Sequence, residues 1–394
     1  MTHPSKVVWL VLSAAAFLLL PPRAAAQSSS AAQAAGQITE PETVIALEVT
    51  ADDGVAAGAA TGHRVRTYGA LRPEGGRHPS TLLVKDGSGS LAKAHNLTNN
   101  LTPLTAQPVF YFGPGITPPG LPSPGFYPDD MYQFTPPGPV VTRAQTHNVY
   151  VNCTADCWGT PTTFQKNLFK SEFIHVVDQY VGSTGNRRYT LGTSASVTYP
   201  VSAPLNDSSD IASIVHAAGV KFGTGYGHIQ NIFLQKGVDV CTAPSLCYSP
   251  DNSATWGTCS YHGYFDFPDI GHALYAVIPY QDDFAVINGT PFYACDVGQP
   301  DPTTNTAATP NGVLVDSTSH VISHEMLETI TDPDYDAWES LSFDSFNTFF
   351  FLPGEIGDVC TNLSYLYTPF EVAGKLYYIE PAYSNKYHLC TTIP

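Results

Sequence analysis

Hydrophobic and polar positions follow two different periods along this chain. Alternation over 147–153 and apolar runs at 273–280 and 284–288 predict strands, because successive strand side chains face opposite sides and buried strands are apolar on both. Apolar residues three and four positions apart predict helices over 162–181 and 208–220. Helical and strand segments do not strictly alternate, so we expect an α+β fold in which helices pack on a mixed sheet.

The pattern divides the chain into three parts. Residues 1–26 combine Lys6, an apolar run and small residues before position 27, which is typical of a secretory signal peptide. Residues 27–140 are Ala- and Ser-rich and then Pro- and Gly-rich, which predicts a linker or pro-region. Residues 141–394 are predicted to form the globular domain. The apolar run is shorter than a membrane span, so we expect a secreted, extracellular protein.

Composition narrows the range of partners. The formal net charge is −17 and charged residues make up 13% of the chain. An acidic surface repels nucleic acids and anionic membranes, so neither is an expected partner once the signal peptide is removed. The expected partner is an extracellular protein.

Eight cysteines behind a predicted signal peptide indicate four disulfides. Eight cysteines allow 105 pairings, so connectivity does not follow from the count. Proximity along the chain suggests the pairs Cys153–Cys157, Cys241–Cys247, Cys259–Cys295 and Cys360–Cys390.

Candidate chemistry is concentrated in the segment HVISHEMLETITDP, residues 320–333. His320, His324 and Glu328 are four residues apart and share one helix face, with Glu325 on its flank. The pattern resembles the H-E-x-x-H helix of zinc metallopeptidases, with Glu328 in place of the second histidine. It predicts zinc bound by His324 and Glu328, with Glu325 as the general base.

A catalytic zinc usually has three protein ligands, so a third is required. His320 is a candidate, but ligands at i, i+4 and i+8 span about 12 Å along a straight helix. A carboxylate from GEIGDVC, Glu355 slightly ahead of Asp358, is therefore preferred. His262, which lies among aromatic residues next to a cysteine, is an additional candidate. We expect Asp316 or residues 317–319 to cap this helix and Pro333 to end it.

Each of these motifs also has a structural interpretation. Polar pairs at i, i+4 are ordinary on helix surfaces, although this helix is otherwise apolar. Alternating carboxylates at 332–336 are similar to a calcium loop, but the glycine at the sixth position and the glutamate at the twelfth, here Phe343, are missing. A helix-terminating turn is therefore favoured at 332–336, and calcium stays an alternative cofactor to zinc.

Several motifs together are similar to the phosphate-induced, EXORDIUM-like family of secreted proteins. They are H-E-x-x-E-x-x-T-D-P at 324–333, Ala337-Trp338 and E-I-G-D-x-C at 355–360. Weaker similarity extends the match to about residues 141–394. The resemblance implies an exported globular protein with disulfides and a role in growth or cell walls, without a defined reaction. It adds a cell-wall substrate to the expected partners. His320, Asp334 and Asp336 lie outside the family pattern.

Two functions are consistent with these features. The first is a secreted zinc-dependent hydrolase, a metallopeptidase that uses metal-activated water. The second is a non-enzymatic extracellular or cell-wall-associated binding protein, with a structural metal or a polar seam at the same residues. The surroundings of Glu325 discriminate between them: a solvent-open cleft beside the ligands favours the enzyme, whereas bulk solvent or a Lys or Arg partner favours the binding protein.

Overall fold

The computed structural model describes the residue ranges 42–69, 82–85, 91–94, 109–111, 130–201, 204–243, 246–249, 258–281, 285–287, 290–292, 309–340, 354–360 and 369–394. These ranges belong to one compact unit, residues 41–394. The predicted signal peptide at 1–26 lies outside the described residues.

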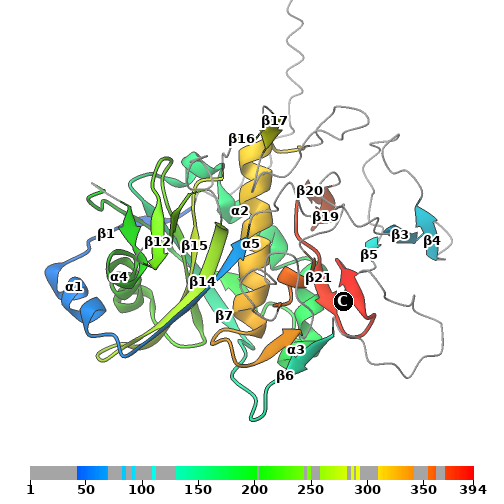
Figure 1. Cartoon of the computed structure of the whole chain (residues 1–394), viewed down its shortest axis with the longest axis horizontal. Helices are drawn as coiled ribbons and strands as arrows, with labels where there is room; N and C mark the ends of the chain where they lie inside the picture. Colours follow the sequence, from blue (N-terminus) through cyan, green and yellow to red (C-terminus); the bar gives the residue numbers. More distant parts are fainter. Residues whose placement is uncertain are drawn as a thin grey trace, which may run out of the picture. The chain divides into compact units, whose positions relative to one another are not determined.

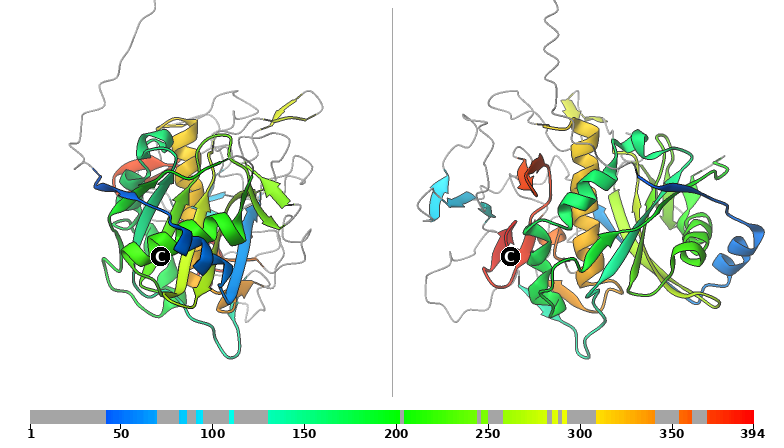
Figure 2. Two further views of the ribbon diagram at one scale, coloured as in Figure 1. Left: turned by 90° about the vertical axis from the view of Figure 1, so that its left-hand side faces the viewer. Right: turned by 180° about the vertical axis from the view of Figure 1, so that it is seen from behind.

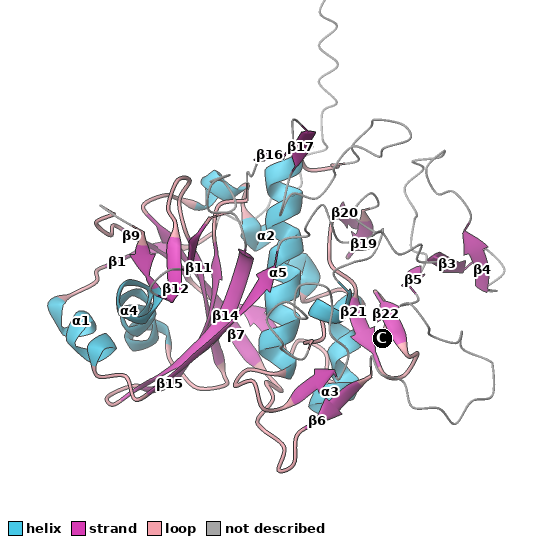
Figure 3. Cartoon of the chain, viewed as in Figure 1, coloured by secondary structure: helices cyan, strands magenta, loops and turns pink. Residues whose placement is uncertain are grey.

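A mixed sheet forms the centre of the fold (Figures 1 and 3). Its strand order is β1-β9-β7-β11-β15-β14-β2, with β8 also paired to β7. In this order, the neighbours β1, β9, β7, β11 and β15 pair in parallel, and β8 is parallel to β7. Strand β14 is antiparallel to both β15 and β2. The α+β class with a mixed sheet is therefore confirmed. The bounds are β1 Val44–Leu47, β2 Gly62–Gly69, β7 Ala144–Val151, β8 Tyr189–Leu191, β9 Ser194–Val197, β11 His228–Phe233, β14 Thr258–Phe267 and β15 Gly271–Ile278.

Alternation along the central strands separates two hydrophobic cores, one on each face of the sheet. Helix α4 (Ala212–Phe222) packs with the core that contains Val149, Ile232 and Val277. Helix α5 (Val313–Thr331) packs with the core that contains Tyr150, Phe233 and Ile278. The two helices accordingly lie on opposite faces, and α1 (Ala51–Gly58) lies beside α4 (Figures 1 and 2).

The single helix predicted over 162–181 is wrong, because the structure divides it. Helix α2 spans Pro161–Leu168, a 3-10 turn spans Phe173–Val177, and α3 spans Asp178–Val181. At the break, the backbone N–H and the hydroxyl of Ser171 both donate to the Leu168 carbonyl, which tightens the chain out of the α-helix. Both pieces still bury apolar residues in one core, so the helical spacing persists across the break.

Helix α5 begins earlier than predicted and ends as predicted. Its N-cap is Gly312. Asp316 lies in the first turn, where it accepts hydrogen bonds from the backbone and side-chain amides of Asn311. The last helical residue is Thr331, two positions before Pro333. Every residue from Asp316 to Thr331 is buried, because the sheet covers one side and chain segments that include α2 and β20 contact the helix elsewhere.

The ordered domain starts before the predicted boundary at residue 141. Strand β1 pairs with β9 and strand β2 pairs with β14, so both belong to the main sheet. Both come from the 27–140 region, and a linker or pro-region interpretation does not hold for them.

Short ladders surround this framework. Strand β6, which precedes β7 in the chain, pairs with β18, which follows α5. Strands β21 and β22 form a hairpin near the C-terminus. None of the described helices has the length and apolar character to span a bilayer. The remaining bounds are β3 Leu82–Lys85, β4 Leu91–Ala94, β5 Val109–Tyr111, β6 Met131–Gln133, β10 Leu205–Asn206, β12 Val240–Ala243, β13 Leu246–Tyr248, β16 Ala285–Ile287, β17 Thr290–Phe292, β18 Trp338–Ser340, β19 Phe370–Val372, β20 Lys375–Tyr377, β21 Ala382–Ser384 and β22 Leu389–Thr391.

Disulfides close several of these segments. The pairs Cys153–Cys157, Cys241–Cys247 and Cys360–Cys390 are present as predicted. Cys259 is also disulfide-bonded, and its predicted partner Cys295 lies outside the described residues. The Cys360–Cys390 bond ties the 3-10 turn at 358–360 to β22.

Candidate metal centre

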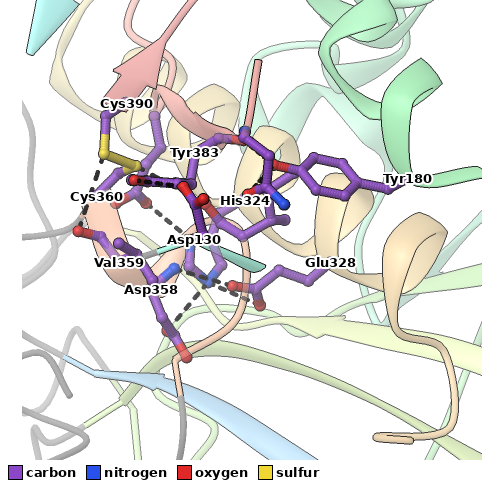
Figure 4. The surroundings of a disulfide bond; sticks show 12 residues. Asp130, Tyr180, His324, Glu328, Asp358, Val359, Cys360, Tyr383 and Cys390 are labelled. Carbon is purple, nitrogen blue, oxygen red and sulfur yellow. Dashed lines mark hydrogen bonds and ion pairs between the residues drawn. A yellow bond between two sulfur atoms is a disulfide. The ribbon is translucent and has the colours of Figure 1, made fainter. Parts of the chain in front are cut away.

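Three buried side chains converge beside the Cys360–Cys390 disulfide: His324 and Glu328 from α5, and Asp358 from the turn at 358–360 (Figure 4). One ligand atom from each lies within 4.8 Å of the other two. His324 Nε2 is 3.0 Å from Glu328 Oε2 and 3.8 Å from Asp358 Oδ1. The helical spacing of four brings the first two together, and the disulfide holds the third close to them. We call these residues the His324 set.

Gly357 allows this approach. A Cβ atom at this position would lie 2.5 Å from His324 Nδ1 and 2.9 Å from Glu328 Oε1. The backbone N–H of the next residue, Asp358, also donates to Glu328 Oε1 at 3.2 Å. The glycine of E-I-G-D therefore lets the backbone lie directly against the two helix side chains.

Glu380 orients His324, and sequence reasoning missed it. Its carboxylate lies 2.8 Å from His324 Nδ1, which leaves Nε2 directed at Glu328. A carboxylate behind a histidine fixes the tautomer and the ring orientation in metal sites. A carboxylate inside the apolar run before Pro381 was the available signal, because a buried carboxylate requires a partner.

A second set forms where strand β14 meets α5. His262, Glu325 and Glu328 also place one ligand atom each within 4.8 Å of one another. His262 Nδ1 is 3.2 Å from Glu325 Oε2 and 3.7 Å from Glu328 Oε2. Ser260 donates to Glu325 Oε1 at 2.5 Å, because residues two apart on a strand point the same way. We call these residues the His262 set.

The other predicted ligands occupy peripheral positions. Glu355, the preferred third ligand, belongs to neither set, and its Oε1 is 3.5 Å from His262 Nε2. The third member of the His324 set is Asp358 instead. His320 lies one turn back, with Nε2 3.8 Å from Glu380 Oε2, and belongs to neither set.

Burial and crowding shift the pKa values of the cluster. Burial alone lowers the pKa of His324, but the Glu328 and Glu380 carboxylates raise it well above its usual range. Burial raises the pKa of Glu325 to about 8 and that of Glu328 to about 7, although His324 opposes both shifts. Burial lowers the pKa of His320 to about 4. Without a cation, the carboxylates of α5 therefore retain protons near neutral pH.

The cluster is closed to solvent in this structure. The two sets contain five different residues. These five residues and Glu355 are each at most 2% exposed. A described cavity of about 230 Å³ lies beside the first half of α5, between residues that include Trp158, Phe164 and Val315, and no member of either set lines it. Glu325 therefore faces neither an open cleft nor bulk solvent, and its described partners are Ser260 and His262.

The carboxylates that follow α5 form a turn. Asp332 Oδ1 accepts the backbone N–H groups of Asp336 and Ala337, and Asp334 bonds Tyr226 and His272. These contacts are those of a helix-terminating turn. Among the described residues, the groups with metal-binding geometry do not include them.

Fold and site together define an α+β protein with a buried histidine–carboxylate cluster that could hold a metal ion. No protein-family model matches the chain, and neither a curated protein nor a solved structure matches it significantly. The EXORDIUM-like resemblance therefore stays a prediction.

Proposed function

We propose that this protein is a zinc-dependent hydrolase, a metallopeptidase, whose metal is held by the His324 set. The observation that carries the proposal is the convergence of one imidazole and two carboxylates within 4.8 Å. Three nitrogen and oxygen ligands are typical of catalytic zinc, which keeps a fourth position open. Closed structural zinc sites usually use cysteine thiolates. The cysteines among the described residues are in disulfides, so they offer no thiolate.

The proposed proton acceptor is Glu325. Zinc in such a site polarises a substrate carbonyl and lowers the pKa of water. Glu325 follows His324 in the chain and is adjacent to Glu328 in the His262 set. The hydroxyl of Ser260 fixes its side chain. The peptidase assignment rests on the similarity of this helix to the H-E-x-x-H helix. Because the cluster is buried, a substrate reaches it only after a local opening.

Burial favours a second candidate, a non-enzymatic extracellular or cell-wall-associated protein with a structural ion. An ion at the His324 set joins α5 to the 354–360 segment without access for a substrate. Carboxylate-rich ligands also suit calcium, which prefers oxygen. Calcium in the purified protein would support this candidate and contradict the zinc hydrolase.

Metal content and turnover test the proposal together. We expect zinc in the purified protein by elemental mass spectrometry, and a content lower by one ion per chain in His324→Ala. His388→Ala is the control, because this histidine is part-exposed and bonded to Asp130. Peptide hydrolysis lost in Glu325→Gln would support the enzyme, whereas a folded, undialysed protein without zinc would contradict it.

A further inference from the structure

We propose that the cluster binds a second divalent cation through His262, Glu325 and Glu328, so that Glu328 bridges two ions. The inference rests on the proposed metal site, because the two sets share Glu328. It adds a ligand set that the H-E-x-x-E helix alone does not provide, since His262 comes from β14.

Glu328 lies between two imidazoles from different elements. Its Oε2 is 3.0 Å from His324 Nε2 and 3.7 Å from His262 Nδ1. Among the described residues, no set of converging ligand atoms contains both histidines. A single ion at either set therefore leaves the other histidine outside its ligands. Two-metal sites hold their ions about 3.5–4 Å apart, a separation that one bridging carboxylate accommodates.

Each histidine has a carboxylate near one of its ring nitrogens. Behind His324, Glu380 Oε2 lies 2.8 Å from Nδ1. Behind His262, Glu355 Oε1 lies 3.5 Å from Nε2. The opposite nitrogen of His324 faces Glu328 at 3.0 Å, and that of His262 faces Glu325 at 3.2 Å and Glu328 at 3.7 Å. Metal-binding histidines usually donate to such a carboxylate or carbonyl partner. The contact behind His324 is a hydrogen bond, whereas Glu355 lies within ion-pair distance of His262, where it could become such a partner.

The charge of the cluster is compatible with two cations. Its described ion pairs join five carboxylates to three imidazoles, and none of them includes Lys or Arg. Buried carboxylates without cations must bind protons. With all five carboxylates ionised, two divalent ions would nearly balance their charge, so the cluster has enough carboxylates for two ions.

The second ion changes the assignment of Glu325. As a proton acceptor beside one ion, Glu325 is not a ligand, and Glu325→Gln keeps the metal content of the wild type. As a ligand of the second ion, Glu325 is no longer the proton acceptor, and Glu325→Gln loses one ion per chain. Two ions would lower the pKa of bound water and stabilise the attacking and leaving oxygens, and the proton of that water would then pass to solvent rather than to Glu325.

The test counts ions and separates the two sites. The full chain is saturated with Zn²⁺ or Mn²⁺, freed of unbound metal by gel filtration and measured by elemental mass spectrometry. We expect two ions per chain in the wild type and one in His262→Gln. Glu355→Gln and Glu380→Gln are a matched isosteric pair, and each should weaken a different one of two affinities about 10–100-fold in chelator competition. Circular dichroism confirms folding of each variant.

The outcomes distinguish this inference from the proposed function. One ion in the wild type that His262→Gln leaves in place overturns the second site alone. The same holds if Glu355→Gln and Glu380→Gln weaken one common affinity. Two ions without peptide hydrolysis support the second site and overturn the enzyme. A folded protein that binds neither metal overturns both.

Discussion

Substitution of Gly357 by alanine tests the packing on which the site depends. The added Cβ would lie 2.5 Å from Nδ1 and 2.7 Å from Cε1 of His324, and 2.9 Å from Glu328 Oε1. Carbon atoms in contact are ordinarily about 3.5–4.0 Å apart, so the ring or the backbone must move by about 1 Å. The backbone of Gly357 does not occupy the left-handed region, so the expected effect is steric rather than conformational.

The cost follows from the two ways in which the structure can respond. If His324 stays in place, the overpacked contact costs about 1–3 kcal/mol. If the ring moves, its buried hydrogen bond to Glu380 is lost, at about 1.5–3 kcal/mol for a bond to a charged group. Both routes therefore lower the free energy of unfolding by about 1–3 kcal/mol. A displaced ring also loses its metal-binding orientation, and we expect about 10–100-fold weaker zinc binding.

Urea unfolding of the metal-free protein and chelator competition for zinc measure the two effects. Gly58→Ala is the matched control, because its added Cβ would have no atom within 4 Å. This change should leave zinc affinity unchanged and alter stability by no more than about 1 kcal/mol, in the stabilising direction. Unchanged stability and zinc affinity in Gly357→Ala would refute the close approach of E-I-G-D to the helix.

Three further predictions concern buried polar groups. Burial raises the pKa of Asp316 from its usual 3.8 to about 6, so the folded protein binds this proton more tightly than the unfolded chain does. The resulting stabilisation is complete below pH 4, and about 3 kcal/mol of the free energy of unfolding is lost as pH rises through 6. Asp316→Asn should remove this part of the slope in urea unfolding between pH 4 and 7, and an unchanged slope would contradict the raised pKa. Cations compete with protons on Glu325 and Glu328, whose pKa values are raised to about 8 and 7, so zinc affinity should fall as pH is lowered from 8 to 6. Calorimetry in buffers of different ionisation enthalpy should show proton release on binding, and pH-independent affinity would argue against these ligands. Ser260→Ala removes the hydroxyl that donates to a buried oxygen of Glu325, and should lower the free energy of unfolding in urea by about 1–3 kcal/mol. The control is Ser208→Ala at an exposed position, which should change this free energy by less than about 0.5 kcal/mol.

The spacing of apolar residues predicted the elements that bury one regular apolar face or run in a hydrophobic core. Strands β7 and β15 overlap the predicted strands at 147–153 and 273–280, because each presents an apolar face or run to a core. Helix α5 contains the segment from His320 that its motif marked as helical, but begins earlier, at Val313. The same signal failed at Ser171, where the chain leaves the helix while the apolar spacing continues. Periodicity reports which side chains are buried, and a short 3-10 turn changes the backbone without changing that set.

Long-range strand pairing explains why the start of the domain was predicted too late, at residue 141. Strand β1 pairs with β9, about 150 positions along the chain, and β2 pairs with β14, about 200 positions along. Strand β1 lies in a short apolar piece, TVIALEVT, and β2 lies in a stretch that is polar with scattered charge, so neither was predicted as part of the domain. Edge strands need only one hydrogen-bonding neighbour, and register on a distant strand leaves little trace in local composition.

The candidate site was predictable in its helix and only in part beyond it. His324, Glu325 and Glu328 follow from spacing on α5, and the choice between Glu355 and Asp358 depended on the turn at 358–360. Of Ser260 and His262 on β14, only His262 was a candidate from the sequence, and the position of the strand that places both opposite Glu325 is known from the sheet. Glu380 had no motif at all, and its role follows only from its contact with His324.

The site therefore depends on tertiary structure more than on the helix motif. Four separate segments supply its carboxylates and imidazoles: α5, β14, residues 354–360 and the Glu380 segment. The Cys360–Cys390 disulfide restrains one of these segments, and Gly357 sets how closely it approaches α5. Because the helix supplies one histidine to the His324 set and none to the His262 set, the histidine from β14, His262, decides whether the cluster is built for one ion or two. The metal content of the His262 variant consequently tests the architecture of the site more directly than any substitution on the helix itself.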